Sequence, residues 1–373
     1  MDVDRAFLHT LAKLKPLISP ISLNNLELKN GFIVAPMTTY SSLDNGIISP
    51  NELPYLARRA QGGFGAIMTA ACYVHPSGKA FTGQWGCDND DKLDSLSQVA
   101  KAIQENGAKA ILQIHHGGRQ CPPALAGGEC ISASAIAAEN PKAIIPREMT
   151  DDEIERTIQD FAQAARRAKQ SGFDGVEIHG ANTYLIQQFV SPHCNRRTDK
   201  WNADDLLFPK RLVETVLAEV GPKFPVGYRF SPEEPETPGI RLETTKRLLN
   251  ELCNFPLSFL HISLRSYDQV SIHEEGTEPT LKQIHQHLAG RLPLFGVGSI
   301  RSAEDVTKSL SLGANALAIG RGAICDVDWV THYQNGEPIR STLSKIDFPE
   351  AYILPAGLAK RIAEVPGWFD FDE

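Results

Sequence analysis

The sequence has little that would direct it to a membrane or a nucleic acid. No apolar run approaches the ~18 residues that a helix needs to cross a bilayer, and the first residues, Met-Asp-Val-Asp, do not form a signal-peptide layout. Basic residues are fewer than acidic ones, which gives a formal net charge of -8 and a pI of about 5.8. We therefore expect neither nucleic acid nor a membrane surface as a partner.

Paired cysteines are also lacking. The chain has no C-x-x-C pair, and its seven cysteines are irregularly spaced, at positions 72, 87, 121, 130, 194, 253 and 325. Such an odd, scattered set suits reduced thiols in the cytoplasm and argues against zinc or iron–sulfur ligation. The adjacent pair His115-His116 is expected on a strand, where neighbours point to opposite faces. We therefore predict a cytoplasmic protein with no bound metal.

An alternation of short β-rich runs and helical patterns dominates the sequence. The expected strands are residues 32–35, 66–71, 110–114, 175–179, 226–229, 259–263, 294–297 and 316–319. The expected helices are residues 52–61, 93–105, 151–171, 209–220, 244–250, 280–287 and 302–310. Eight such units predict an α/β protein with a single (β/α)8 TIM barrel. An open doubly wound sheet is the weaker alternative, because no strand leads into a dinucleotide-binding glycine fingerprint.

The segments around the barrel are assigned within one domain, residues 1–373. Residues 1–30 are expected to form an N-terminal arm over 1–15 and then a short hairpin around an Asn-Asn turn. The barrel is assigned to residues 31–335 and a C-terminal segment to 336–373. The Gly-, Pro- and Ala-rich connection after the third strand, residues 115–149, is too long for a simple loop. We expect it to form a lid or an extra subdomain on the catalytic face.

Polar side chains recur where the predicted strands end. His179, Asn182 and Tyr184 follow the fourth strand, and Gln113 and Arg229 end the third and fifth. Strand ends converge on one pocket in a barrel, so this placement favours a catalytic site. Each residue also has a structural alternative: His179 and Asn182 could cap a helix, Gln113 and Thr38 could satisfy backbone groups, and Arg229 could pair with a carboxylate inside the barrel.

Glycines follow the last two strands, in the pairs Gly298-Ser299 and Gly320-Arg321. Glycine lets backbone N–H groups approach an anion closely, and an arginine can hold a phosphate through two hydrogen bonds. The loops after strands seven and eight are the usual phosphate site of this fold. The sequence therefore predicts a phosphorylated ligand in the barrel.

Several motifs together resemble the old yellow enzyme family of FMN-dependent oxidoreductases. Within that family the chain is most similar to the bacterial NADH-dependent flavin oxidoreductases (the NADH:flavin oxidoreductase/NADH oxidase branch), from about Leu17 to past Trp329. The motifs are Ala-Pro-Met-Thr-Thr-Tyr at 35–40, Gln113-x-x-His-x-Gly-Arg119, His179-x-x-Asn182-x-Tyr184, Ser191-Pro-x-x-Asn-x-Arg-Thr-Asp199 and Gly320-Arg321.

The resemblance implies a non-covalently bound FMN, with NADH or NADPH as the reductant. Gln113 would bond the pyrimidine edge of the flavin, and Arg229 would lie near its N1 and C2=O. The residues implied to line the ring are Pro36, Met37, Thr38 and Ala70, and those implied to hold the phosphate are Gly298, Ser299, Gly320 and Arg321. A homo-oligomer is compatible with the resemblance.

The resemblance also implies the chemistry. His179 and Asn182 would donate to the oxygen of an α,β-unsaturated carbonyl compound or a similarly activated alkene, whose β-carbon accepts a hydride from flavin N5. Tyr184 would supply the proton to the α-carbon. One departure from many relatives bears on this arrangement: Thr183 stands where they have glycine, so the angle of Tyr184 could differ.

Two other functions stay open on the sequence alone. The same FMN site could reduce oxygen, a quinone or free flavin with electrons from NAD(P)H. Alternatively, the barrel could bind flavin without turnover. The complete set of His179, Asn182 and Tyr184 argues against the inactive barrel.

Overall fold

The computed structural model describes residues 17–139 and 143–372, so the predicted arm at 1–15 lies outside the described residues. Eight parallel strands pair in sequence order, and the first of them also pairs with the last, which closes the barrel. They are β3 (Phe32–Val34), β4 (Ala66–Met68), β7 (Lys109–His115), β10 (Gly175–Gly180), β11 (Val226–Phe230), β12 (Phe259–Ile262), β13 (Leu294–Val297) and β14 (Ala316–Ile319). The predicted (β/α)8 barrel is confirmed.

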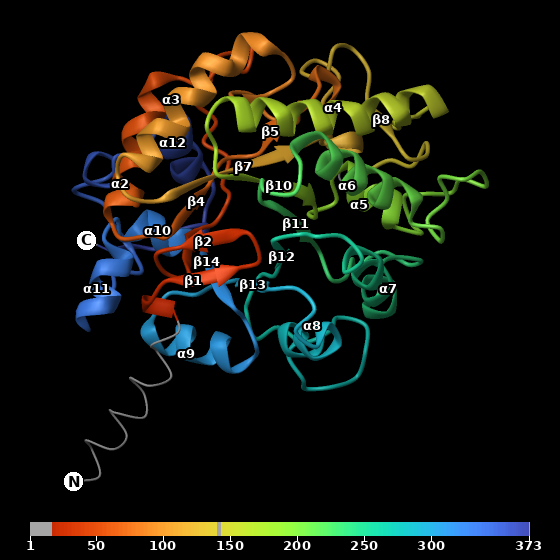
Figure 1. Ribbon diagram of the computed structural model, residues 1–373. Coiled ribbons are helices and arrows are strands. Elements are labelled where there is room, and N and C mark those ends of the chain that lie inside the picture. Colours follow the sequence, from red (N-terminus) through yellow and green to blue (C-terminus); the bar gives the residue numbers. More distant parts are fainter. Residues whose placement is uncertain (1–16, 140–142, 373) are drawn as a thin grey trace.

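Helices surround the strands (Figure 1) and occupy all seven predicted helical stretches. These are α2 (Leu53–Gln61), α3 (Leu93–Gln104), α4 (Asp151–Gln170), α6 (Leu207–Val220), α7 (Leu242–Leu252), α8 (Thr280–Leu288) and α9 (Ala303–Ser311). Two of these helices, α4 and α9, begin with a capping box. The hydroxyl of Thr150 or Ser302 accepts a hydrogen bond from the backbone N–H three residues later, and the side chain of that later residue accepts one from the backbone N–H of Thr150 or Ser302. The sequence did not predict α5 (Leu185–Val190), α10 (Arg321–Cys325), α11 (Trp329–Asn335) or α12 (Ala356–Glu364).

Short elements complete the chain. The remaining strands are β5 (Cys72–Tyr73), β6 (Trp85–Gly86), β8 (Ile131–Ser132), β9 (Arg147–Glu148), β15 (Leu343–Ser344) and β16 (Phe371–Asp372). The 3-10 turns are η1 (Pro50–Glu52), η2 (Pro76–Gly78), η3 (Asp90–Lys92), η4 (Gly118–Gln120) and η5 (Glu350–Tyr352). Within the described ranges, no helix has the length and apolar character needed to cross a membrane. All seven cysteines are free thiols.

The predicted hairpin closes one end of the barrel. Strands β1 (Ile21–Leu23) and β2 (Leu26–Leu28) pair antiparallel, and Figure 1 shows them across the near end of the barrel. Their leucines at 23, 26 and 28 pack in one cluster with Phe259, Phe295 and other residues of the barrel strands. Asn24 Nδ2 donates to the Leu257 carbonyl at 2.6 Å, which fixes the turn beside β12. The hairpin therefore forms an apolar floor.

The connection after β7, described over residues 115–139 and 143–149, lies at the opposite end, above the carboxyl ends of the strands. Its strands β8 and β9 pair with each other, and Gln188 of α5 bonds to it at several points. Gln188 Oε1 accepts from Ser132 Oγ at 2.8 Å and from the Arg119 backbone N at 3.1 Å, while Nε2 donates to the Gly117 carbonyl at 3.2 Å. This connection and α5 therefore form one hydrogen-bonded unit on the face where the polar strand ends lie.

Candidate active site

A pocket lies at the carboxyl ends of the strands, and we call it the strand-end pocket. Seven residues predicted to bind a cofactor line it: Pro36, Met37, Arg229, Gly298, Ser299, Gly320 and Arg321. The sequence analysis missed three polar or aromatic lining residues, Arg265, Arg301 and Trp368. Trp368 comes from the C-terminal segment, which no strand or loop pattern linked to the site. The barrel thus gathers residues from six separate stretches of chain around one cavity.

Positive charge gathers in the strand-end pocket. The Arg321 guanidinium donates to Ser299 Oγ at 3.1 Å and to the Trp368 carbonyl at 3.4 Å. Arg265 and Arg301 line the same pocket. Burial, together with the neighbouring charge of Arg301, lowers the pKa of Arg321. A partly buried concentration of guanidinium groups is suited to a phosphate or another anion.

The turn after β13 requires its glycine. Gly298 has a φ of +118°, and a Cβ placed there would lie 2.8 Å from the Ser266 carbonyl carbon. Ser299 follows in the left-handed region, with a φ of 52°. Only glycine adopts the first of these conformations without strain and leaves room for the neighbouring backbone. This tight turn brings the Ser299 hydroxyl to Arg321.

A buried carboxylate that the sequence analysis missed lies inside the barrel. Glu177 of β10 is fully buried and accepts from Gln113 Nε2 and His261 Nδ1, each at 2.7 Å. Burial alone would raise the pKa of Glu177, but the charges of His261 and Arg229 and these two hydrogen bonds outweigh it, so its pKa is lowered. Glu177 is therefore an ionised group beneath the pocket.

The guanidinium group of Arg229 donates one hydrogen bond within the protein and has one N–H without a partner. Its charge favours the ionised form of the Glu177 carboxyl. Its NH2 group donates to Ser263 Oγ at 3.3 Å, while its buried Nε has no hydrogen-bond partner. An unpaired buried donor costs about 1–3 kcal/mol. Arg229 therefore presents a donor that an acceptor in the strand-end pocket would satisfy.

Three other predicted cofactor residues do not line the strand-end pocket: Thr38, Ala70 and Gln113. Thr38 is half-buried, and Ala70 and Gln113 are buried. The chain next to Thr38 is held in place, because Thr39 Oγ1 and Trp85 Nε1 both donate hydrogen bonds to the fully buried Glu52 carboxylate. The structure therefore holds Thr38 firmly next to the pocket residue Met37.

His179, the next-to-last residue of β10, has a neutral ring with a defined proton position. Burial, together with the nearby His115 and Arg229, lowers its pKa well below the ordinary value. Its Nδ1 accepts from the Ala181 backbone N at 3.3 Å, so the single proton of the neutral ring is on Nε2. In strand register His179 lies beside Arg229. The ring therefore offers one N–H donor next to the pocket.

Asn182 is connected to the pocket through a short chain of hydrogen bonds. Ser263 Oγ donates to its Oδ1 at 2.8 Å, and Ser263 Oγ in turn accepts from Arg229. The Asn182 backbone N donates to Ser231 Oγ at 2.8 Å, which holds the loop. Because the amide oxygen is already engaged, its NH2 end remains available as a donor.

Tyr184 packs edge-on against two histidines. Its ring centroid is 5.1 Å from that of His179 and 4.4 Å from that of His115, with interplanar angles of 89° and 83°. Burial, reinforced by Tyr40 and Cys121, raises the pKa of Tyr184 above its ordinary value. The phenol is therefore protonated at neutral pH and able to donate.

The chain between Asn182 and Tyr184 is strained. Asn182 and Thr183 have φ values of 56° and 62°, and the left-handed region is unfavourable for a β-branched residue such as threonine. Three glutamines hold Thr183: Gln120 donates to its hydroxyl at 2.9 Å, Gln188 donates to its carbonyl at 2.7 Å, and Gln187 accepts from its N–H at 2.9 Å. This explains why glycine would suit the position, and why threonine can still be held there.

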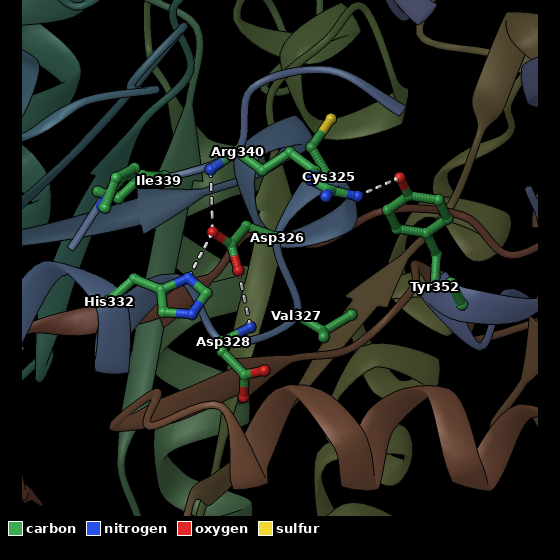
Figure 2. A pocket seen from close by; sticks show the side chains of 10 residues that line it. Cys325, Asp326, Val327, Asp328, His332, Ile339, Arg340 and Tyr352 are labelled. Atoms are coloured by element: carbon green, nitrogen blue, oxygen red, sulfur yellow. Dashed lines mark hydrogen bonds and ion pairs between the residues drawn. The ribbon is translucent and has the colours of Figure 1, made fainter. Parts of the chain in front are cut away.

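A second cavity shows a different arrangement of charge. It has a volume of about 470 Å³, against about 220 Å³ for the strand-end pocket, and Figure 2 shows the side chains around it. Asp326 accepts from His332 Nδ1 at 2.8 Å and from the backbone N of Asp328 and Arg340, both at 3.0 Å. Arg340 donates to Tyr352 Oη at 3.1 Å. Because these groups satisfy one another, we interpret this cavity as a structural joint that holds the C-terminal segment.

Comparisons with known proteins give matches over most of this chain. Residues 16–339 match the model of the NADH:flavin oxidoreductase / NADH oxidase family. A Bacillus subtilis protein named as a probable NADH-dependent flavin oxidoreductase is 39% identical over 97% of this chain and 99% of its own length. An NADH:acrylate oxidoreductase of Vibrio harveyi and an NADH:fumarate oxidoreductase of Klebsiella pneumoniae are 40% and 38% identical over 84% and 87% of this chain. The matched part covers only 32% and 36% of those two longer proteins.

Solved structures share the fold. A morphinone reductase in complex with tetrahydroNAD has a TM-score of 0.77 and 25% identity, over 96% of this chain and 98% of that chain. A 2-naphthoyl-CoA reductase in complex with 2-naphthoyl-CoA has a TM-score of 0.78 and 26% identity, over 87% of this chain and 53% of that chain. The barrel described above is thus the architecture of these oxidoreductases.

Proposed function

Since the chain belongs to the NADH:flavin oxidoreductase / NADH oxidase family, we propose that it reduces the C=C bond of α,β-unsaturated carbonyl compounds or similarly activated alkenes. As a member it is an NAD(P)H-dependent flavin oxidoreductase that uses FMN. The observation that carries the proposal is the placement of two oriented donors, His179 Nε2 and the Asn182 amide, beside a protonated Tyr184. The seven free thiols support a cytoplasmic location.

The strand-end pocket fits FMN. Arg229 Nε is a buried donor without a partner, suited to the electron-rich edge of the flavin ring. Arg321, Ser299 and the tight turn at Gly298 provide a cationic cradle suited to the phosphate, with Gly320 beside them. Pro36, Met37, Thr38 and Ala70 would contact the ring, and Gln113 its polar edge. When bound, FMN supplies the hydride for the reaction.

His179 and Asn182 bind the substrate oxygen in this proposal. Both groups are neutral donors, so they stabilise negative charge that develops on a carbonyl oxygen without attracting a permanent anion. The contact from Ser263 sets the orientation of the Asn182 amide, and the Ala181 N–H sets the tautomer of His179. The site is thus organised before the substrate arrives.

Tyr184 is the proton donor in this proposal. Its raised pKa keeps the proton on the phenol until a carbanion forms beside it, and Arg229 lies near enough to favour the phenolate afterwards. His115 and His179 pack against the ring and fix its position. The phenol therefore acts separately from the two donors that bind the oxygen.

The relatives support an activated alkene as the acceptor. Acrylate and fumarate, named in two of them, are alkenes conjugated to a carboxyl group. An electron-withdrawing group next to the C=C bond makes the distant carbon able to accept a hydride, which is the property that the donors at His179 and Asn182 would reinforce.

The test is an anaerobic visible spectrum of the FMN-loaded protein, followed through addition of NADH and then of 2-cyclohexenone. We expect NADH to bleach the flavin bands and the enone to restore them. Bleaching that the enone and acrylate both fail to reverse would replace the proposal with oxygen, quinone or free flavin as the acceptor. Flavin bands that neither NADH nor NADPH bleaches would indicate an inactive flavin-binding barrel.

Replacing Tyr184 with phenylalanine tests the role of the phenol. General acid catalysis contributes about 10²–10⁴-fold, so Tyr184→Phe should slow the alkene half-reaction by at least about 10²-fold. Reduction of the flavin by NADH should stay within about twofold of wild type, because that step needs no phenol proton. Equal losses in both half-reactions would show that Tyr184 supports the site in another way.

A further inference from the structure

A cluster of metal-ligand side chains lies outside the strand-end pocket. Glu139, His193 and Glu236 each offer a ligand atom, and these three atoms lie within 4.8 Å of one another. Glu139 belongs to the 115–149 connection, His193 to the motif that begins at Ser191, and Glu236 to the loop between β11 and α7. The three residues are far apart in sequence, so no spacing pattern could reveal them.

Two side chains of this cluster each contain a buried atom that has no hydrogen-bond partner. The Glu236 side chain is 7% exposed, and its Oε2 is buried and unpaired, while its Oε1 lies 3.8 Å from Arg119. Nδ1 of His193 is also buried and unpaired. Each unpaired group costs about 1–3 kcal/mol, more when it is charged. Ser191 Oγ accepts from the His193 backbone N at 3.1 Å and so holds the residue in place.

We propose that Glu139, His193 and Glu236 bind a divalent transition-metal ion of the zinc class. An imidazole with two carboxylates is a donor set that suits zinc, whereas calcium and magnesium prefer oxygen ligands alone. Zinc–ligand bonds are about 2.0–2.2 Å, so the side chains would close inward by roughly an ångström on binding. Arg119 balances one of the two carboxylate charges, which leaves a net negative site for the cation.

Such an ion would connect three loops of the strand-end face. It would tie the 115–149 connection to the chain after α5 and to the loop after β11, on the side of the barrel where ligands enter. The connection already bonds to α5 through Gln188. The metal site would thus fix the position of this connection, and it does not depend on which acceptor the flavin reduces.

The test is equilibrium dialysis of the FMN-loaded, chelator-stripped protein against Zn²⁺. We expect one Zn²⁺ per chain, and we expect Glu139→Gln, His193→Ala and Glu236→Gln each to weaken the binding by at least about 10-fold, since each removes a ligand. Glu139 is exposed, so its variant should fold normally. The matched controls are His287→Ala and Glu304→Gln on distant helices, which should leave binding unchanged.

A structural readout separates a specific site from surface binding. Zn²⁺ should slow proteolytic cleavage within residues 115–149 in the wild type and not in Glu139→Gln. Absence of stoichiometric binding would overturn the proposal, as would binding that all three variants retain. Binding that the His287 and Glu304 controls weaken equally would also overturn it, since the ion would then be held by surface groups.

Discussion

The strand-end pocket and the cavity beside Asp326 contain similar groups but differ in how those groups are paired. Around Asp326 each charged group bonds to its neighbours, so the cavity holds the C-terminal segment in place. In the strand-end pocket, Arg229 Nε remains unpaired and several arginines share the space with few carboxylates. The smaller cavity is therefore the better candidate for a ligand site, because an unpaired buried donor beside it calls for an acceptor.

Removing a cation from the strand-end pocket should have the largest effect. We expect Arg321→Met to raise the Kd for FMN by about 100-fold, since charge-assisted contacts to a phosphate contribute roughly 3 kcal/mol. The measurement is a titration of apoprotein with FMN, followed by quenching of flavin fluorescence. The matched variant at the other cavity, Arg340→Met, should leave FMN affinity unchanged. Equal affinities for both variants would remove the distinction between the two cavities.

At the cavity beside Asp326 we expect a loss of stability and no loss of FMN affinity. Asp326→Asn should lower the free energy of unfolding by about 2 kcal/mol, because the amide cannot accept from all three donors and its own NH2 faces one of them. Thermal denaturation of the FMN-loaded protein measures the loss. FMN affinity should not change. A variant that loses FMN while keeping its melting temperature would show that this cavity communicates with the site.

The strained residue next to Tyr184 provides a smaller test. Asparagine tolerates the left-handed region better than threonine and still offers an oxygen to Gln120, so Thr183→Asn should stabilise the protein by up to about 1 kcal/mol. Chemical denaturation measures this gain. The rate of alkene reduction should stay within about twofold of wild type, since the other glutamine contacts are to the backbone. A loss of rate without a loss of stability would show that the threonine methyl group positions Tyr184.

The smallest effect concerns pH. The hydrogen bond that His332 Nδ1 donates to the Asp326 carboxylate raises the pKa of His332 above its ordinary value. Protonated His332 therefore stabilises the folded protein. This contribution is complete below the ordinary histidine pKa of about 6.5 and is lost as the pH rises through the raised pKa of the folded state. As the pH rises from about 6 to 8, the melting temperature should fall more for the wild type than for His332→Gln. The difference should be small, because the His332 ring is partly exposed. Parallel curves for the two proteins would contradict this.

The barrel could be predicted from the sequence because its strands are buried on both faces. Residues 294–297 and 316–319 are apolar runs between turn signals, and β13 and β14 occupy the same residues. Helix starts were equally clear where a side chain satisfies the backbone locally, as at Thr150. Both signals depend only on neighbouring residues, so they can be read from one sequence.

The polar interior of the barrel could not be predicted in the same way. Glu177 interrupts an apolar strand, and its partners Gln113 and His261 are 64 and 84 residues away along the chain. Strand register brings Gln113 and Glu177 together, but register is a property of the closed barrel. Trp368 reaches the strand-end pocket through the path of the C-terminal segment, which has no periodic pattern. Such contacts depend on tertiary geometry that a local pattern does not contain.

The hairpin floor has a consequence for how the chain folds. Leu23, Leu26 and Leu28 are synthesised before every barrel strand, yet their packing partners include Phe259 and Phe295. The hydrogen bond from Asn24 to Leu257 spans 233 residues. Contacts of such large sequence separation form slowly, so these leucines stay exposed while most of the chain emerges from the ribosome. The element that seals the finished barrel is thus among the last to be packed.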